Sequence, residues 1–337
     1  MTSANLGTSA YHLIEPQEGL QYFFTVEATN GAGLKEAVYS DGITVDSSPP
    51  VIEGIYHGVK QEQNVAPQSM IQNDGRFIAF HWDKPYDNES GISSVEWCAG
   101  TKNTSCNIVS STPVGPENTS VKYFMSESLA SGTFVFVMLV VTNGAGLTST
   151  IVTQALLIDT SPPMVGNVTV GKSTGTTYFK KGDSITAAWS GFADGESLLS
   201  NFEWAICKAS VKNECISPYV NVGLKTEAFI EVLGIDYGIS YIVTVRAFNK
   251  AGLFVEAASN EFILDGVMPS AETVFDGLER EKDIEFQSSS TQLSANWLPF
   301  TDINSRIADY EICAGTDRKS TRLNSSHEIP SRMPSSA

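Results

Sequence analysis

Basic residues, histidines and long apolar runs are all scarce in this sequence. Its 337 residues include 21 lysines and arginines against 38 aspartates and glutamates, which gives a formal net charge of −17. This excess of negative charge repels phosphate groups, so nucleic acids and anionic membrane surfaces are excluded as partners. The longest uninterrupted apolar run, Phe134–Val141, is far too short to span a bilayer. We therefore expect no membrane insertion within this chain.

Motifs for nucleophilic, zinc-dependent or phosphate-transfer catalysis are missing as well. The sequence has no Gly-x-Ser-x-Gly elbow, no zinc-protease helix signature and no phosphate-binding loop. Its four histidines are scattered, and His12, His57 and His81 fall at unrelated positions. We expect that this chain is not an enzyme and that it needs no cofactor.

The C-terminal segment 317–337 differs from everything before it, since it has no aromatic residue and no strand pattern. Its first part, DRKSTRLNSSH, matches the translation of a common sequencing adapter residue for residue, and residues 331–337 match the far end of that adapter. The alternative is a native, serine-rich disordered tail. We expect the segment to be adapter-derived, non-native and disordered, and we exclude it from the fold.

Several motifs recur along the rest of the chain with a period of roughly 105–115 residues. One set consists of asparagines that begin an Asn-x-Ala-Gly-Leu motif: Asn30, Asn143 and Asn249. A second set consists of aspartates that begin an Asp-x-x-x-Pro motif: Asp46, Asp159 and Asp265. A third set consists of tryptophans at the end of an apolar strand pattern: Trp82, Trp189 and Trp297. Chance does not produce three landmarks with one period, so the chain is an array of repeats.

Each repeat has the patterns of an all-β domain. The run from Tyr22 to Ala28 alternates apolar and polar residues with period two, which is typical of a half-buried strand. The glycines that follow allow a tight turn, and the Pro-Pro pairs stop the next strand. No long helical periodicity is present. Short strands in units of about 100 residues predict β-sandwiches.

The tryptophan strand, the (Val/Phe)-Glu-Trp strand and the Tyr-x-x-x-Val-x-Ala-x-Asn-x-Ala-Gly run together resemble the fibronectin type III family. The resemblance implies an all-β fold of tandem fibronectin-III/immunoglobulin-like β-sandwich modules. It also implies that Trp82, Trp189 and Trp297 are core residues of the second strand. Tyr22 and Tyr241 match the tyrosine-corner position of that family, whereas Val135 stands there in the second repeat.

The phase of the repeats predicts two whole modules and two partial ones. We expect the last strands of a module in 1–48, whole modules in 49–161 and 162–268, and the first strands of another in 269–316. On this interpretation the protein extends beyond both ends, and Met1 is not its true start.

The five cysteines have a regular spacing. Cys98 and Cys106 lie eight residues apart, as do Cys207 and Cys215, and both pairs follow the Glu-Trp strand. Facing residues of a hairpin lie within disulfide range, so we favour one disulfide in each pair. A metal site is the alternative, but this is not zinc spacing and no histidine is near. Cys313 would be left without its partner near position 321.

Disulfides indicate an oxidising compartment, and glycosylation sequons agree with it. Four sequons precede the tail, at Asn88, Asn103, Asn118 and Asn167. We expect an extracellular location or a cell-surface ectodomain.

An acidic loop motif is the only candidate for ligand chemistry. The Asp-x-Glu-Ser sequence supplies Asp87 and Glu89 in one repeat and Asp194 and Glu196 in the next. Such carboxylates are weak candidates for a calcium site, because calcium binds six to eight oxygens. A β-turn held by the aspartate is the interpretation that we favour.

We therefore expect a non-catalytic, extracellular array that binds other extracellular or cell-surface proteins in adhesion or as part of a receptor. Two alternatives remain: spacer modules of a larger secreted or membrane-bound enzyme, and a calcium-dependent adhesion array. Fold alone does not name the ligand.

Overall fold

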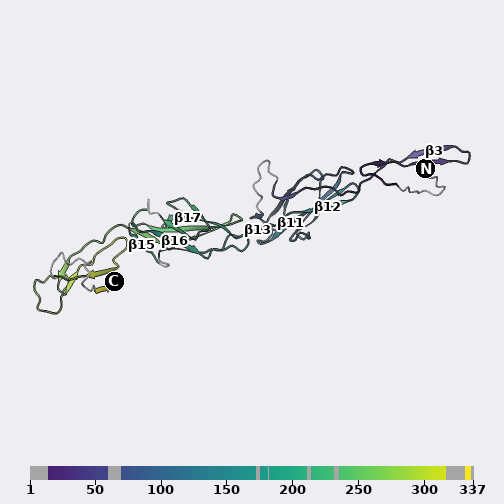
Figure 1. Cartoon of the computed structure of the whole chain (residues 1–337). Helices are drawn as coiled ribbons and strands as arrows, with labels where there is room; N and C mark the ends of the chain where they lie inside the picture. Colours follow the sequence, from purple (N-terminus) through teal and green to yellow (C-terminus); the bar gives the residue numbers. More distant parts are fainter. Residues whose placement is uncertain are drawn as a thin grey trace. The chain divides into compact units, whose positions relative to one another are not determined.

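The computed structural model describes residues 14–59, 70–171, 175–180, 182–210, 214–230, 235–315 and 331–334. For Ile230 and for 331–334 it describes the backbone only. Every regular element in the described ranges is a β-strand, as Figure 1 shows. The chain is all-β, as the sequence predicts. It divides into two units, with the boundary after Ser161, except that Lys250–Leu253 group with the first unit. His12 lies outside the described residues.

The described strands between Ile55 and Ile158 form a sandwich of two sheets. The first is antiparallel, in the order β10–β7–β5, from β5 (Ile55–His57), β7 (Phe77–Trp82) and β10 (Ser120–Phe124). The second has the order β6–β13–β11–β8–β9, and β12 also pairs with β11. Its strands are β6 (Ile71–Gln72), β8 (Ile92–Gly100), β9 (Val109–Val114), β11 (Phe134–Asn143), β12 (Thr148–Val152) and β13 (Leu156–Ile158). This order, three strands facing a larger sheet built on a central long strand pair, is that of a fibronectin-III-like sandwich.

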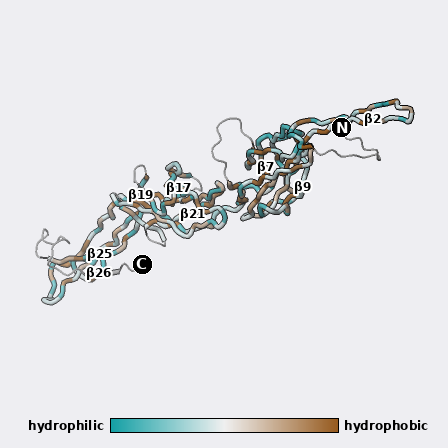
Figure 2. The backbone as a smooth tube through the Cα atoms, turned by 45° about the vertical axis from the view of Figure 1, so that its right-hand side comes forward, coloured by the Kyte–Doolittle hydropathy of each residue, from teal (hydrophilic) through white to brown (hydrophobic). Residues whose placement is uncertain are grey.

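The core of this module lies between the two sheets. Alternate residues of β11 are buried, and the intervening ones are half-buried except Phe134, which is exposed. On the facing sheet Trp82 is fully buried, and Phe80 packs on both Trp82 (ring centroids 5.5 Å apart) and Trp97 (4.9 Å). Hydrophobic colour runs along the strands around β7 and β9 in Figure 2. The predicted core position of Trp82 is where the structure places it.

The described strands between Asn167 and Asp265 repeat the same arrangement. One sheet has the order β14–β16–β19, the other β15–β22–β20–β17–β18, and β21 also pairs with β20. The strands are β14 (Asn167–Val170), β15 (Thr177–Lys180), β16 (Ile185–Ser190), β17 (Leu199–Lys208), β18 (Val220–Gly223), β19 (Glu227–Ile230), β20 (Ser240–Asn249), β21 (Phe254–Ala258) and β22 (Phe262–Asp265). Trp189 is 3% exposed and packs on Phe202, in the position that Trp82 occupies one repeat earlier.

The first and last parts of the chain form only two-stranded pieces. Their strands are β1 (Gln21–Tyr22), β2 (Thr25–Thr29), β3 (Lys35–Tyr39), β4 (Ile43–Thr44), β23 (Val274–Asp276), β24 (Ala295–Trp297), β25 (Asp309–Ile312) and β26 (Ser331–Pro334). Many of their apolar side chains are exposed: Val26 is 64% and Tyr39 is 74% exposed. Trp297 is only half-buried, so it is less enclosed than expected for a core residue. A sheet without a facing sheet leaves its apolar side uncovered.

The C-terminal tail is described only at β26, which pairs antiparallel with β25. The expectation of a disordered tail is therefore not met at these four residues, because the free edge of β25 offers unpaired backbone groups to any neighbouring extended segment. The adapter interpretation of 317–337 stays a prediction.

A tyrosine hydroxyl ties back to the backbone in two repeats. Tyr22 accepts a hydrogen bond from the backbone N–H of Gln17 (2.9 Å), and Tyr241 accepts one from Asp236 (3.2 Å). Both partners lie five residues upstream, as in a tyrosine corner. In the repeat between them, the equivalent residue Val135 is fully buried and has no hydroxyl group to form this hydrogen bond.

Removing the Tyr241 hydroxyl should weaken residues 162–268. We expect Tyr241→Phe to lower the free energy of unfolding by about 1 kcal/mol, because the N–H of Asp236 loses its acceptor. Hydrogen exchange of peptides from β20 measures the loss. Tyr178→Phe, at an exposed tyrosine of the same module, is the control and should change nothing; equal effects would contradict a corner role.

The structure joins Cys98 to Cys106 and Cys207 to Cys215 by disulfides, the two pairs that the spacing favoured. The Cα atoms of Cys98 and Cys106 are 5.4 Å apart, and Cys207 faces Cys215 across an antiparallel bridge. Cys313 follows β25 and is half-buried. Its expected partner position near 321 lies outside the described residues.

Candidate functional site at the first junction

One carboxylate closes the loop that follows β7. Asp87 Oδ1 accepts the backbone N–H groups of Glu89 (3.3 Å), Ser90 (2.9 Å) and Gly91 (3.2 Å). Aspartate suits this position because its short side chain reaches backbone amides that have no strand partner. The loop is thus a turn held by Asp87, in agreement with the interpretation that the sequence favoured.

The same hydrogen bonds recur in the next two repeats. Asp194 Oδ1 accepts from the N–H groups of Ser197 (2.8 Å) and Leu198 (2.9 Å), and Asp302 Oδ1 accepts from Ser305 (2.7 Å). The residue after the serine has a positive φ in every case: Gly91 (70°), Leu198 (67°) and Arg306 (63°). Leucine and arginine cost about 1–2 kcal/mol in this conformation, which the bonds to the aspartate help to offset.

Glycine should relieve this strain at Leu198. We expect Leu198→Gly to raise the free energy of unfolding of residues 162–268 by about 0.5–1 kcal/mol, since the side chain is 56% exposed and little burial is lost. Leu224→Gly is the matched control, because Leu224 is also exposed but has no positive φ, and this change should destabilise. Thermal denaturation distinguishes the two signs, and a loss of stability in both variants would contradict the strain at Leu198.

Asn143 links three separate segments at one end of residues 49–161. It lies at the end of β11 and is 1% exposed. Its Nδ2 donates toward Asp46 Oδ2 (2.8 Å), the carbonyl oxygen of Ser48 (2.9 Å) and Asp87 Oδ2 (3.1 Å). Its Oδ1 accepts the N–H of Leu147 (2.8 Å) and so closes its own Asn-Gly-Ala-Gly-Leu turn. One amide thus ties together the linker between β4 and β5 (residues 45–54), the β7–β8 loop and the β11–β12 turn.

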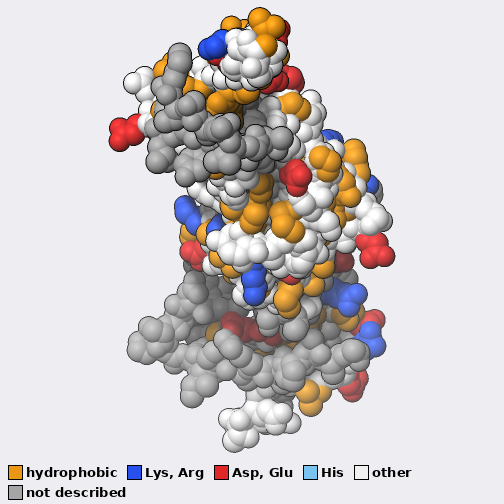
Figure 3. Space-filling model, turned by 90° about the vertical axis from the view of Figure 1, so that its right-hand side faces the viewer, with side chains coloured by type: hydrophobic (Ala, Val, Ile, Leu, Met, Phe, Trp, Pro, Cys, Tyr) orange, Lys and Arg blue, Asp and Glu red, His pale blue; other side chains and the backbone are white. Residues whose placement is uncertain are grey.

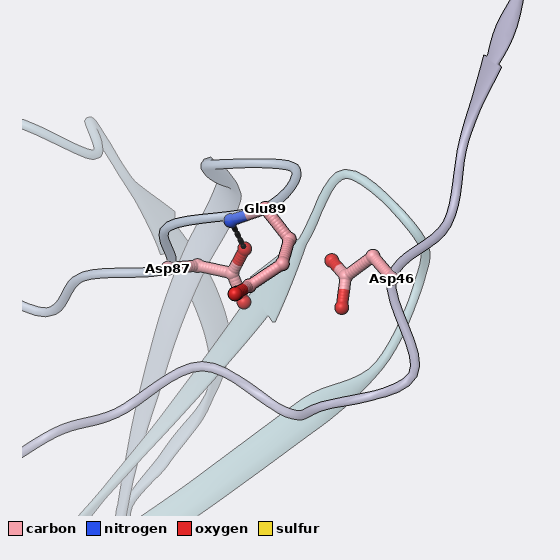
Figure 4. A group of neighbouring side chains, drawn as sticks. All are labelled: Asp46, Asp87 and Glu89. Atoms are coloured by element: carbon pink, nitrogen blue, oxygen red, sulfur yellow. Dashed lines mark hydrogen bonds between the residues drawn. The ribbon is translucent and has the colours of Figure 1, made fainter. Parts of the chain in front are cut away.

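Three carboxylates converge beside this amide. One oxygen each of Asp46, Asp87 and Glu89 lies within 4.8 Å of the others. Figure 4 shows Asp46 approaching from the linker and the other two from the loop. Ser90 Oγ donates to Asp46 Oδ2 and accepts the N–H of Ala145 (3.1 Å). We call Asp46, Asp87, Glu89, Ser90 and Asn143 the junction cluster.

Hydrogen bonds lower the pKa of Asp87. The backbone N–H of Ser90 has the largest effect. Burial, the second largest, opposes it, and the amide of Asn143 and the N–H groups of Glu89 and Gly91 add smaller contributions that lower the pKa. Each of these donors favours the charged carboxylate over the neutral acid. Asp87 therefore stays ionised to a lower pH than an ordinary aspartate does.

This shift makes the stability of residues 49–161 depend on pH. Because the folded pKa lies below the unfolded one, near 3.9, the unfolded chain takes up its proton first as the pH falls. We expect stability from Asp87 to be fully present above about pH 4 and lost below it. Denaturation at several pH values measures this, and Asp87→Asn, which keeps the side-chain carbonyl, should flatten the profile. An unchanged profile would contradict the role of Asp87.

The later repeats keep parts of the junction cluster. Asn249 Nδ2 donates to Asp194 Oδ2 (3.1 Å), as Asn143 does to Asp87. Asn304 stands where the earlier loops have glutamate, and its Nδ2 donates to Asp265 Oδ1 (3.3 Å). Glu196 is exposed. An amide–carboxylate contact between neighbouring motifs is therefore a recurring feature of the repeats.

The sequence pointed to only part of this cluster. Asp87 and Glu89 were candidates, whereas Asp46 and Asn143 served only as markers of the repeat. Their motifs share one period with the acidic loop, and that common period was the available signal that all of them meet. The four sequon asparagines, Asn88, Asn103, Asn118 and Asn167, are all exposed. Their glycosylation stays a prediction.

The remaining histidines take no part in the junction cluster. His81 alternates with buried Trp82 and is half-buried on the outer side of its sheet, beside Tyr56. His57 is 4% exposed, and its Nε2 lies 2.8 Å from the carbonyl oxygen of Gln154. Burial lowers the pKa of His57, which favours the neutral ring. Both histidines pack as structural residues.

Comparison with known proteins gives only distant structural likenesses. No protein-family model matches the sequence, and no curated protein matches it. Among solved structures, the FN1–FN3 domains of chicken CNTN1 have 16% identity and a TM-score of 0.32, covering 67% of this chain and 72% of that one. The fibronectin(III)-like modules of Clostridium thermocellum CbhA have 15% identity and a TM-score of 0.31, covering 63% and 95%.

A 1.5-MDa bacterial ice-binding adhesin has 19% identity and a TM-score of 0.38, covering 70% of this chain and 71% of that one. Likenesses of such low identity and score say nothing about function. The fibronectin-III-like fold follows from the strand order of each sandwich.

Lys and Arg side chains lie apart from one another on the face that Figure 3 shows. Several are paired with acids, as in Lys84–Glu117 (2.6 Å) and Arg246–Glu256 (2.9 Å). In the part of the chain that the structure describes, no helix is long and apolar enough to cross a membrane.

Proposed function

We propose that this chain is part of an extracellular array of fibronectin-III-like modules that acts as a spacer and an adhesion surface and that performs no catalysis. The observation that carries the proposal is the junction cluster. Asn143 ties the linker residue Asp46 to two loops of the module that follows it. A linker bonded at its end to the next module has a restricted direction, which is what a spacer requires.

The expected partners are other extracellular or cell-surface proteins, met through loops and sheet faces. Two disulfides and exposed sequon asparagines support an oxidising, secretory compartment. The alternative is that these modules are spacers of a larger secreted or membrane-bound enzyme. A longer sequence with a catalytic domain would keep the spacer role and change the function of the whole protein.

Distance distributions between two spin labels test the spacer role. Glu36 and Thr148 are exposed, lie on either side of the linker, and can be changed to labelled cysteines in a Cys313→Ser background. We expect one narrow distribution, which broadens in Asn143→Ala because the linker loses its amide contact. Asn118→Ala, at an exposed asparagine outside the cluster, is the control. A broad distribution in the unchanged protein would contradict a spacer held at this junction.

A calcium-dependent array is the second candidate, because three carboxylates converge on one point. Calcium coordinated by them would also neutralise their mutual repulsion. A calcium titration followed by thermal denaturation tests this against magnesium. A rise in melting temperature that Glu89→Gln abolishes would support calcium binding, and no shift at millimolar calcium would leave the cluster as a structural turn.

A further inference from the structure

The sequence Thr-Asn-Gly-Ala-Gly-Leu occurs twice, at 29–34 and at 142–147. Asparagine followed by glycine is the pair most prone to deamidation, because the glycine leaves its backbone nitrogen sterically open. Since the six residues are identical, any difference in reactivity between Asn30 and Asn143 must come from the surrounding structure. The two sites are therefore a matched pair within one chain.

Their surroundings differ at both reacting groups. Asn30 is exposed, and among the residues that the structure describes neither its Nδ2 nor the N–H of Gly31 has a hydrogen-bond acceptor. Asn143 is 1% exposed, and its Nδ2 donates within the junction cluster. The N–H of Gly144 donates to the carbonyl oxygen of Gly91 (3.0 Å). Both the leaving nitrogen and the attacking nitrogen are thus held at Asn143.

Glycine is also required at 144 in this fold. A Cβ there would lie 2.7 Å from the carbonyl oxygen of Ser90, which is too close for any other residue without backbone movement. The close packing against the β7–β8 loop therefore requires glycine after Asn143, and Asn-Gly is the pair most prone to deamidation. Asn249 is followed by Lys250, so that repeat lacks the reactive pair.

We propose that Asn143–Gly144 is a deamidation site that the closed junction protects, so that its conversion records the release of linker residue Asp46 and then makes that release permanent. The backbone nitrogen of Gly144 loses its proton and bonds to Cγ of Asn143, and the Cγ–Nδ2 bond breaks as ammonia leaves with that proton. Water then opens the succinimide, giving aspartate or isoaspartate. The product is a fourth carboxylate beside Asp46, Asp87 and Glu89, where the amide donor stood.

The reaction requires the junction to open, because the folded contacts restrain both reacting groups. Its rate at Asn143 is then the intrinsic rate multiplied by the fraction of open molecules. Once formed, the carboxylate repels its neighbours instead of donating to them. The open junction therefore does not close again at neutral pH.

Peptide mass spectrometry of the full chain, incubated at mildly alkaline pH and body temperature, tests this. In urea we expect equal rates at Asn30 and Asn143. In the folded chain we expect Asn143 to convert at least about tenfold more slowly. Equal rates in the folded chain would overturn the protection.

Asp46→Ala tests whether the junction is what protects Asn143. We expect the rate at Asn143 to rise severalfold while the rate at Asn30 stays the same, whereas the control Asp41→Ala changes neither. An unchanged rate in Asp46→Ala, with the normal rise in urea, would overturn the role of the linker. Asn143→Asp should lower the melting temperature of the first unit more than Asn30→Asp does, and equal shifts would contradict the consequence proposed for the product.

Discussion

Trp82→Ala is expected to destabilise residues 49–161 by about 4 kcal/mol. Trp82 is fully buried, and its ring packs on Phe80, which in turn packs on Trp97. The substitution removes the largest side chain from the centre of the sandwich and leaves a cavity that rigid β-strands close only in part. Because small domains have only about 5–15 kcal/mol of stability, this loss is a large fraction of the total.

Hydrogen exchange resolved by peptide measures the effect in the whole chain. Peptides from β11 should lose protection, while peptides from β20 in the next module serve as an internal control. His81→Ala, one residue away on the outer side of the sheet, should cost far less. Similar losses for the two substitutions would mean that Trp82 is not the centre of the core.

Asn143→Ala is expected to lower the stability of the same module by about 3 kcal/mol. The change deletes the acceptor of the Leu147 N–H and the amide that donates toward two carboxylates. Hydrogen bonds to charged groups are worth about 1.5–3 kcal/mol, and a buried group that loses its partner adds to the cost. Loss of the amide also leaves Asp46 and Asp87 to repel each other.

Asn30→Ala separates the contribution of the turn to stability from that of the contacts with the carboxylates of the junction cluster. Asn30 closes the same turn through Oδ1, which accepts from the N–H groups of Ala32 and Leu34 (3.0 Å each). We expect a loss of only about 1 kcal/mol there, measured as exchange of peptides spanning β2 and β3. If Asn30→Ala and Asn143→Ala weakened their surroundings equally, the contacts with the carboxylates would contribute nothing.

The all-β architecture could be predicted from the sequence because the strand period and the repeat period both follow from the order of the residues. Alternation in Tyr22–Ala28 and the recurrence of tryptophan at one spacing needed no knowledge of contacts. The cysteine pairs were accessible for the same reason, since an even spacing of eight about a turn brings two strand residues opposite each other. The partial burial of Trp297 was not accessible, because it depends on whether a second sheet faces β24.

The sequence predicted only part of the candidate site. The turn at Asp87 is local, since a carboxylate oxygen of Asp87 accepts hydrogen bonds from the next few backbone amides. The Asp-x-x-Ser pattern therefore predicts it. The sequence did not predict the positive φ at Leu198 and Arg306. Neither residue type favours that conformation, and only the closure of the loop imposes it.

The sequence alone determined the class of fold and the length of the repeat, since both follow from the periodicity of residues along the chain. Only the tertiary structure decided that Asp46, Asp87 and Asn143 meet, because Asn143 lies 97 residues from Asp46 and 56 from Asp87 along the chain. It also decided that the two identical Asn-Gly pairs have different environments: Asn30 is exposed, whereas Asn143 is buried and hydrogen-bonded. Reactivity of this kind depends on which groups folding brings into hydrogen-bond distance.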